Sequence, residues 1–413
     1  MDEIPGLAAR RAGLRMGDAV LRRGETLERA AHGATQGMRD AADRALALAI
    51  AAEALRWLAD LDALIDSATR TNLPDDAKPR AVLRLMLAQW LRLGTPPHAV
   101  IATALPLLTG GPRRLAHGVF STLVKRGASL PDAPTLPPGV AARWGERAPL
   151  IAAALAEPPP LDLTLRDPAS TALWTERLGG TSLMPGHVRL SRGSAVEKLA
   201  GFAEGAWWVQ DIAASLPARL LGAGEGRRVL DCCAAPGGKT LQLAAACWQV
   251  TALDHSAKRL DRVRENLART GLSAEIVVAD ALEWMPEKPF DAVLLDAPCT
   301  ATGTARRHPD VLHRIGPRQI AEMADLQERL IARAMGWLAP GGALVYAVCS
   351  LEHAEGAGQA ARIGLDPWPI AADELPAGIA PTPEGWLRTD PAMLPGEGAD
   401  GGMDGFFVGR WRA

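Results

Sequence analysis

The sequence predicts an α/β fold, a doubly wound and mostly parallel sheet in the C-terminal half, preceded by an all-α region. Beyond residue 228, short apolar runs alternate with amphipathic stretches, which is typical of strands joined by helices. Between residues 38 and 126, apolar residues instead recur at helical spacing, without strand-like alternation. At 413 residues the chain exceeds what one hydrophobic core usually serves, so two or three domains are expected.

Composition shifts along the chain suggest four segments. Residues 1–130 are expected to form the all-α domain, with Gly/Pro breaks between its helices. A proline-rich passage at 131–160 is expected to be a linker, although a helix is possible near 148–156. Residues 161–215 are weakly periodic and are predicted to be a small connecting subdomain, and residues 216–413 are predicted to hold the sheet.

Within the sheet domain, β-branched and aliphatic runs predict strands at 229–233, 250–254, 276–280, 292–296 and 343–348. Amphipathic stretches between them predict helices at 239–246, 256–270 and 319–338, the last stopped by Pro340-Gly341-Gly342.

Charge and cysteine content narrow the class of protein. The chain carries a net charge of -2, but residues 1–130 hold 18 Lys+Arg against 13 Asp+Glu, a balance compatible with phosphate contacts or with an ordinary solvated surface. Five cysteines with no C-x-x-C pair predict neither a disulfide framework nor a metal site. No apolar leader or membrane-length stretch is evident, so a cytoplasmic protein without membrane contact is expected.

Polar side chains follow the five predicted strands. In an open parallel sheet, ligands bind at the carboxyl ends of the strands. A single Asp there is usually a turn or cap residue, but several at one edge indicate one site. The residues concerned are Asp231, Asp254, Asp280, Asp296 and Cys349.

The first predicted strand leads into Cys-Ala-Ala-Pro-Gly-Gly-Lys-Thr at 233–240, where small residues let the backbone approach a bound molecule. Cys233 stands where a phosphate-binding loop requires Gly, so a nucleoside without phosphates fits better. Asp254 could accept hydrogen bonds from a ribose diol, and Asp280 could face an adenine. Carboxylates also suit the sulfonium of S-adenosylmethionine, which we take as the hypothetical cofactor.

Two cysteines, Cys299 and Cys349, follow neighbouring strands. A lone cysteine is more often a small buried hydrophobe, but two at the active edge favour chemistry. Carbon 5 of cytosine becomes nucleophilic when a thiolate adds to carbon 6, and breakdown of that adduct calls for a second group nearby. Asp296 could hydrogen-bond cytosine nitrogen 3 as charge builds there.

These motifs resemble the Sun/Fmu family of RNA cytosine-5 methyltransferases, with matches also at 204–211, 306–310 and 404–407. The resemblance implies a Rossmann-like methyltransferase domain in which Cys349 is the nucleophile and Cys299 assists adduct breakdown. It further implies that Asp296 is catalytic and that S-adenosylmethionine is bound by Cys233, Ala234, Ala235, Pro236, Gly237, Gly238, Lys239, Asp254, Asp280 and Asp296. Arg306, Arg307 and His308 would contact the RNA backbone.

The N-terminal half resembles the NusB-like RNA-binding domain at 83–85, 96–100 and 116–126. Together the two resemblances imply an rRNA-processing enzyme of the bacterial cytoplasm that acts on small-subunit (16S) rRNA, as a monomer and without DNA. The chain departs from the family pattern at Val348 (usually Thr) and Thr300 (usually Ser). It also departs at 351–359, which lacks the expected Pro-Glu-Glu-Asn run.

Three alternatives remain open at this point. An RNA-binding ribosome-assembly factor could keep the fold without turnover, although the intact cysteine pair argues against it. Another RNA, such as tRNA, could be the substrate. An amine methyltransferase would tend to carry Asn/Asp-Pro-Pro-Tyr after the fourth strand, where this chain has Asp-Ala-Pro-Cys, and a nitrogen nucleophile would need no cysteine.

Overall fold

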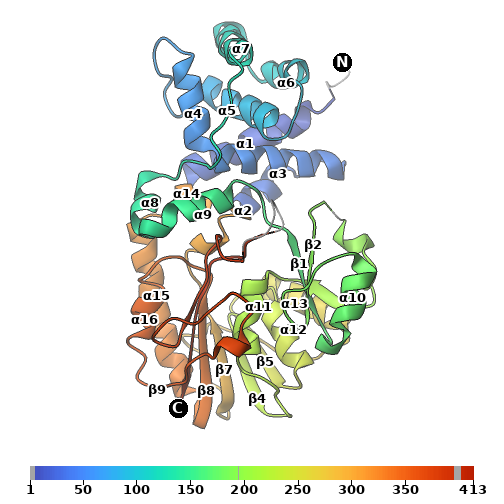
Figure 1. Ribbon diagram of the computed structural model, residues 1–413, viewed down its shortest axis with the longest axis vertical. Coiled ribbons are helices and arrows are strands. Elements are labelled where there is room, and N and C mark those ends of the chain that lie inside the picture. The colour runs from blue at the N-terminus through green and yellow to red at the C-terminus, as the bar shows by residue number, and fades with distance from the viewer. Residues whose placement is uncertain (1–4, 194, 395–400) are drawn as a thin grey trace. The chain divides into compact units, whose positions relative to one another are not determined.

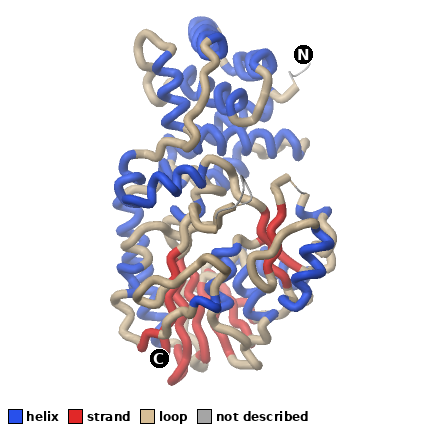
Figure 2. The backbone as a smooth tube through the Cα atoms, viewed as in Figure 1, coloured by secondary structure: helices blue, strands red, loops and turns tan. Residues whose placement is uncertain are grey.

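The computed structural model describes residues 5–193, 195–394 and 401–413. The chain divides into two compact units: unit 1 comprises residues 1–156 and 307–315, and unit 2 comprises residues 157–306 and 316–413. Figure 2 shows that unit 1 is built of helices and loops, whereas unit 2 contains the strands. The predicted combination of an all-α domain with an α/β domain is confirmed.

Unit 1 is a bundle of amphipathic helices around a common core. Its largest buried side chains include Trp57, Ile50, Leu61 and Phe120. The helices before the proline-rich passage are α1 (Leu7–Arg23), α2 (Leu27–Ala34), α3 (Ala41–Arg56), α4 (Leu58–Ser67), α5 (Lys78–Leu91), α6 (Pro97–Ala104) and α7 (Gly110–Lys125).

The proline-rich passage predicted as a linker carries two helices, α8 (Pro138–Trp144) and α9 (Ala148–Leu155). In both, a proline occupies the first or second helical position, where its missing N–H has no intrahelical partner to lose. Val140, Trp144 and Ile151 are buried. Contacts divide the chain after Ala156, near the end of the 131–160 passage in which the sequence analysis placed the linker.

A short segment from far along the sequence belongs to unit 1. Residues Arg307–Ile315 carry α14 (Val311–Arg314), which packs on α1. His313 Nε2 lies 2.7 Å from the carbonyl oxygen of Leu55, and burial lowers the pKa of His313. In the sequence this segment follows the fourth predicted strand, inside the part predicted to hold the sheet. Its local sequence pattern gave no indication that it belongs to the helical unit.

Unit 2 begins with a small antiparallel sheet of order β2-β1-β3: β1 (Leu161–Leu165), β2 (His187–Leu190) and β3 (Trp207–Val209), flanked by α10 (Thr171–Leu178). Asp162 on β1 is buried and receives two bonds from Arg189, at 2.7 and 2.8 Å, and one from the Ile212 amide. This ion pair stabilises the sheet from inside, since both charges are hydrogen-bonded.

The main sheet of unit 2 has the order β10-β11-β8-β7-β4-β5-β6, with β9 paired to β11. Strands β4 to β8 pair in parallel, and β11 closes the edge antiparallel to β8. The predicted mostly parallel sheet is confirmed. The strands are β4 (Arg228–Cys232), β5 (Gln249–Asp254), β6 (Glu275–Val278), β7 (Phe290–Asp296), β8 (Leu338–Val348), β9 (Asp366–Pro367), β10 (Leu387–Arg388) and β11 (Phe407–Arg412).

Successive residues of the central strands face two different cores, as the twofold period of a strand requires. Val229, Leu294 and Val345 face the core that includes α11 (Ile212–Arg219) and α12 (Gly238–Ala245), while Leu230 and Tyr346 face α15 (Pro317–Gly336). Helix α13 (Ala257–Thr270) covers β5 and β6. Helices thus cover both faces of the sheet, with α15 and α16 (Ala357–Ala360) on the opposite side from α12 and α13 (Figure 1).

Two features of unit 2 differ from the sequence-based expectation. Strand β8 begins at Leu338, so Pro340-Gly341-Gly342 lies within its bounds rather than only ending a helix. The C-terminal segment forms β11, which the sequence analysis did not predict. Among the described residues, no helix combines the length and apolar character needed to cross a membrane.

Candidate active site

The two cysteines meet at the ends of neighbouring strands. Parallel pairing of β7 with β8 sets Asp296 opposite Ala347, so the residues that follow each strand emerge side by side. Cys349 follows β8 directly, Cys299 follows β7 after a Pro-containing turn, and their sulfur atoms lie 3.4 Å apart. Both cysteines are free and half-buried. This distance permits a proton to be shared between two thiols.

Backbone hydrogen bonds fix both cysteine-bearing loops. The Ala297 amide donates to the Ala347 carbonyl at 2.9 Å, and the Gly303 amide donates to the carbonyl of Cys349 at 3.1 Å. Gly303 in turn accepts from the Gly405 amide at 2.8 Å. A Cβ at position 303 would collide with the Gly405 carbonyl, so glycine is required at this crossing.

The two thiols, Cys299 and Cys349, have different charged neighbours. The hydrogen bond shared with Cys349, burial and the nearby charges of Cys349 and Glu355 raise the pKa of Cys299 well above its usual value. Lys239 Nζ lies 2.7 Å from Asp296 Oδ2. Burial opposes the charge on Lys239, but Asp296 and, to a smaller extent, Cys349 and Asp231 outweigh it and raise the pKa of the amine. The site therefore holds a persistent cation beside Cys349.

The loop at residues 233–237 connects β4 to α12 at the same edge. Cys233 has φ 66° and Gly237 φ 105°, both in the left-handed region. The amides of Cys233 and Ala234 donate to the carbonyl of Leu253 on β5. A Cβ at Gly237 would press on Val263 at 3.1 to 3.3 Å, so the loop lies against α13 and turns toward the strand ends.

Asp231 is the most perturbed carboxylate of this edge. It is buried on β4 and accepts a 2.5 Å bond from the Thr240 hydroxyl on one oxygen. Among the described residues its other oxygen, Oδ1, has no hydrogen-bond partner. Burial raises the pKa of Asp231 to about 7, with Asp296 and Asp254 adding to the effect and Thr240 opposing it. An unpaired buried acceptor at a strand end suits a cationic or hydrogen-bonding ligand.

The other two predicted carboxylates differ from each other. Asp254, buried at the end of β5, accepts from the amides of Ala235 at 3.2 Å and Ser256 at 2.9 Å. Asp280 is exposed beyond β6 and accepts from the Leu282 amide at 2.9 Å. Asp254 is thus tied to the loop after β4, whereas Asp280 marks the outer rim of the same edge.

Sequence reasoning missed one residue at the centre of the site and placed others differently. Glu355, six residues after Cys349, is fully buried and bonded to both cysteine loops. A carboxylate soon after a strand-end nucleophile is the one signal that could have indicated it. Arg306, expected on the RNA backbone, is buried and donates to the Gly401 carbonyl at 2.8 Å. Arg307 and His308 belong to unit 1.

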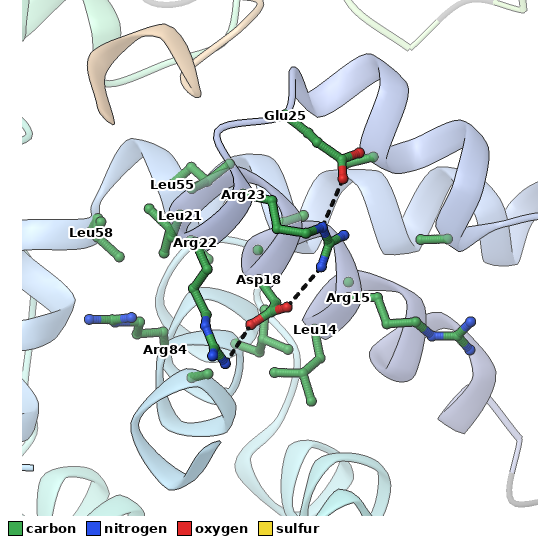
Figure 3. Close-up of a pocket in the computed structure, with 18 of the residues that line it drawn as sticks. Leu14, Arg15, Asp18, Leu21, Arg22, Arg23, Glu25, Leu55, Leu58 and Arg84 are labelled. Atoms are coloured by element: carbon green, nitrogen blue, oxygen red, sulfur yellow. Dashed lines mark hydrogen bonds and ion pairs between the residues drawn. The ribbon is translucent and has the colours of Figure 1, made fainter. Parts of the chain in front are cut away.

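Unit 1 has a hollow of about 520 Å³ between α1, α2, α3 and α5, with no part in the cysteine site. Leu14, Leu21 and Leu55 supply apolar lining, and charged side chains of both signs surround it (Figure 3). Asp18 pairs with Arg22 at 3.2 Å and with Arg23 at 3.0 Å, while Arg15 is exposed. The hollow thus combines an apolar floor with a rim of mixed charge.

The doubly wound sheet, the loop at residues 233–237 and the acidic residues at the strand ends are typical of a Rossmann-like methyltransferase domain. Comparisons with known proteins agree. Residues 218–367 match the family described as 16S rRNA methyltransferase RsmB/F, and residues 8–109 match the NusB family.

Curated relatives cover most of the chain. Ribosomal RNA small subunit methyltransferase B of Xanthomonas campestris is 36% identical over 84% of this chain and 85% of its own length. That of Xylella fastidiosa is 34% identical over 98% of both. The structure of NSun6 from Pyrococcus horikoshii with SFG shares the fold, with TM-score 0.57 and 19% identity over 67% of this chain and 98% of its own. This chain belongs to the ribosomal RNA small subunit methyltransferase B family, so the predicted enzyme class is confirmed.

Proposed function

We propose that this protein methylates carbon 5 of a cytosine in small-subunit rRNA through a covalent adduct with Cys349. The observation that carries the proposal is the pair of sulfur atoms 3.4 Å apart, with a lysine charge beside Cys349. A methyltransferase for oxygen or nitrogen needs no thiol at this place, whereas addition to carbon 6 of cytosine needs one thiolate, and breakdown of the adduct calls for a second group nearby.

The chain's own groups fit S-adenosylmethionine, which supplies a methyl group on a positively charged sulfur when bound. The unpaired Oδ1 of Asp231 can accept from or lie near a cationic group. Asp254 can accept hydrogen bonds from the two hydroxyls of a ribose with its remaining lone pairs. Asp280 lies at the rim of the same edge, where an adenine would project. The backbone from Cys233 through Gly238, with Lys239, would line the cofactor's amino acid part.

Cys349 would begin the reaction as a thiolate that forms a bond to carbon 6 of the cytosine. Lys239 stabilises the negative charge on sulfur before the bond forms, because its own positive charge is maintained by Asp296 and Cys349. Asp296 is partly exposed and would hydrogen-bond cytosine nitrogen 3 as the ring gains electron density, provided that it takes up a proton at that stage.

Cys299 would act in the breakdown of the adduct. Its raised pKa keeps it protonated while Cys349 is the thiolate. As the carbon 6–sulfur bond breaks, Cys299 can give its proton to the departing sulfur and take the proton lost from carbon 5 in exchange. The methyl group replaces one proton on the base, and that proton remains on the thiol pair.

The RNA class rests on the relatives and on unit 1. Relatives spanning most of this chain are named for the small ribosomal subunit, and unit 1 matches the NusB family over residues 8–109. We assign the helical unit to RNA binding, which places substrate recognition and chemistry in different parts of the chain.

The test is transfer of labelled methyl groups from S-adenosylmethionine to unmodified small-subunit rRNA, free and in assembled particles, with nuclease digestion to identify the base. Wild type should yield 5-methylcytosine, and Cys349→Ala should yield none. Cys247→Ser, a change at an exposed cysteine, is the matched control and should keep wild-type activity. Methylation of tRNA alone would contradict the rRNA assignment. RNA binding without any methyl transfer would favour an assembly factor instead.

A further inference from the structure

The buried carboxylate of Glu355 links the two cysteine loops. Glu355 Oε1 accepts from the Thr300 amide at 2.8 Å, and Oε2 accepts from the hydroxyls of Thr300 and Ser350. Thr300 follows Cys299 and Ser350 follows Cys349 in the chain. One side chain therefore holds the residue next to each sulfur, and moving it would move both loops.

Helix α15 and strand β8 hold Glu355 itself in place. Gln327 on α15 is buried and donates to Glu355 Oε1 at 3.1 Å and to the Pro298 carbonyl at 2.8 Å. The hydroxyl of Tyr346 on β8 donates to the Glu355 carbonyl at 2.6 Å. Helix α15 thus holds the carboxylate of Glu355, and strand β8 holds its backbone.

Four donors surround the carboxylate, which matches the number of hydrogen bonds that its two oxygens can accept. Its charge faces Cys299 and adds to the effects that raise the pKa of that thiol. On the other sulfur the neighbouring charge is Lys239, whose own pKa is raised in part by Cys349. The two thiols are chemically identical, so these surroundings are what distinguish them.

We propose that Glu355 is a positioning residue that sets the spacing of the two thiols and keeps the proton on Cys299, so that Cys349 is the nucleophile. The inference rests on the proposed function, but its effect on the thiols exists without RNA or cofactor. Removing the charge of Glu355 while keeping its side-chain volume should therefore make Cys299 and Cys349 more alike in reactivity. Removing the charge of a carboxylate that has only a structural role should not.

The test measures which cysteine reacts. The full chain and its Glu355→Gln variant are treated with iodoacetamide across pH 6 to 9, roughly the range in which thiols titrate, and modified peptides are quantified. Wild type should react mainly at Cys349, and Glu355→Gln should lower the Cys349:Cys299 ratio about tenfold. In the transfer assay the same variant should lower kcat with little change in KM for RNA.

Two further variants separate charge from structure. Glu355→Asp keeps the charge and should keep the preference for Cys349. Asp162→Asn changes another buried, hydrogen-bonded carboxylate of unit 2 and should lower stability without altering the preference. An unchanged ratio in Glu355→Gln, or an equal shift in Asp162→Asn, would overturn the inference.

Two other outcomes are also decisive. If Glu355→Gln does not fold, Glu355→Asp and Thr300→Val take its place, and loss of the Cys349 preference in Glu355→Asp would contradict the role of charge. Thr300→Val removes one donor from Glu355 and should lower kcat; an unchanged kcat would contradict the positioning role. If wild type prefers Cys349 but methylates no RNA, the proposed function fails while the role of Glu355 stands.

Discussion

Two buried carboxylates of unit 2 show how the small sheet differs from the strand ends of the main sheet. Asp162 in the small sheet is bonded to Arg189 and to a backbone amide, and the interactions with Arg189 and His187 outweigh burial and lower its pKa. Asp231 at the main sheet has one hydroxyl partner, an unpaired oxygen and a pKa raised to about 7. Asp162 is hydrogen-bonded on both of its oxygens, whereas Asp231 keeps one buried oxygen without a partner among the described residues.

The largest effect should come from breaking the satisfied carboxylate. Asp162→Ala removes the carboxylate that pairs with the buried Arg189, and breaking a buried ion pair in this way typically costs about 3–5 kcal/mol. Urea unfolding monitored by circular dichroism measures the loss of free energy of unfolding. Because the folded pKa of Asp162 is lowered, its contribution is present above pH 4 or so and is lost as the pH falls. A loss below about 1 kcal/mol would show that the ion pair contributes little.

Asp231 should show the opposite pH dependence. The folded protein holds a proton on Asp231 up to about pH 7, whereas the unfolded chain releases it near 3.8, so this group makes stability fall as pH rises between these values. Asp231→Asn should remove that slope and be more stable than wild type at pH 8. Denaturation at pH 5 and pH 8 measures the difference. Equal slopes in both proteins would contradict an unsatisfied Asp231.

A change on the thiol side of the same edge should affect catalysis more than stability. Lys239→Met removes the cation beside Cys349 and Asp296 and should lower kcat/KM about 10²-fold. Lys288→Met, at an exposed lysine, is the matched control. Full activity in Lys239→Met would remove this residue from the site.

The smallest effect is expected at the solvated hollow of unit 1, where charges are exposed and individually weak. Reversing Arg15 and Arg29 together should weaken RNA binding several-fold and reduce its salt dependence, without changing kcat. Arg39→Glu, on an exposed residue of unit 1 outside the hollow, is the control. Filter binding at several salt concentrations measures both quantities. Equal losses in the test and control variants would show that the hollow has no particular role.

Much of the fold could be predicted, because the spacing of apolar residues and the acidic residues that follow strands are both visible in the local sequence. The five predicted strands correspond to β4, β5, β6, β7 and β8, and parallel pairing then brings Cys299 and Cys349 together. Residue roles stay predictions, but their convergence on one edge follows from sheet geometry alone.

What the sequence did not reveal depends on long-range packing. Strand β3 is three residues long, too short to show a period, and β11 is recognisable only once it pairs with β8. The prolines before α8 suggested only a linker, because a helix start and a helix break use the same residue, whereas α9 was expected as a possible helix near 148–156. No periodic pattern in the sequence predicts the role of Glu355, because that role depends on two loops that meet only in the folded chain.

The most direct test of the account is whether Cys299→Ala traps RNA on the protein. Incubated with S-adenosylmethionine and unmodified small-subunit rRNA, this variant should accumulate a complex that survives denaturing electrophoresis, with mass spectrometry placing a nucleotide on Cys349. Cys299 sits 3.4 Å from the attacking sulfur and would no longer be there to assist its release. A nucleotide on another residue, or active turnover of Cys299→Ala without any adduct, would contradict the division of roles between the two cysteines.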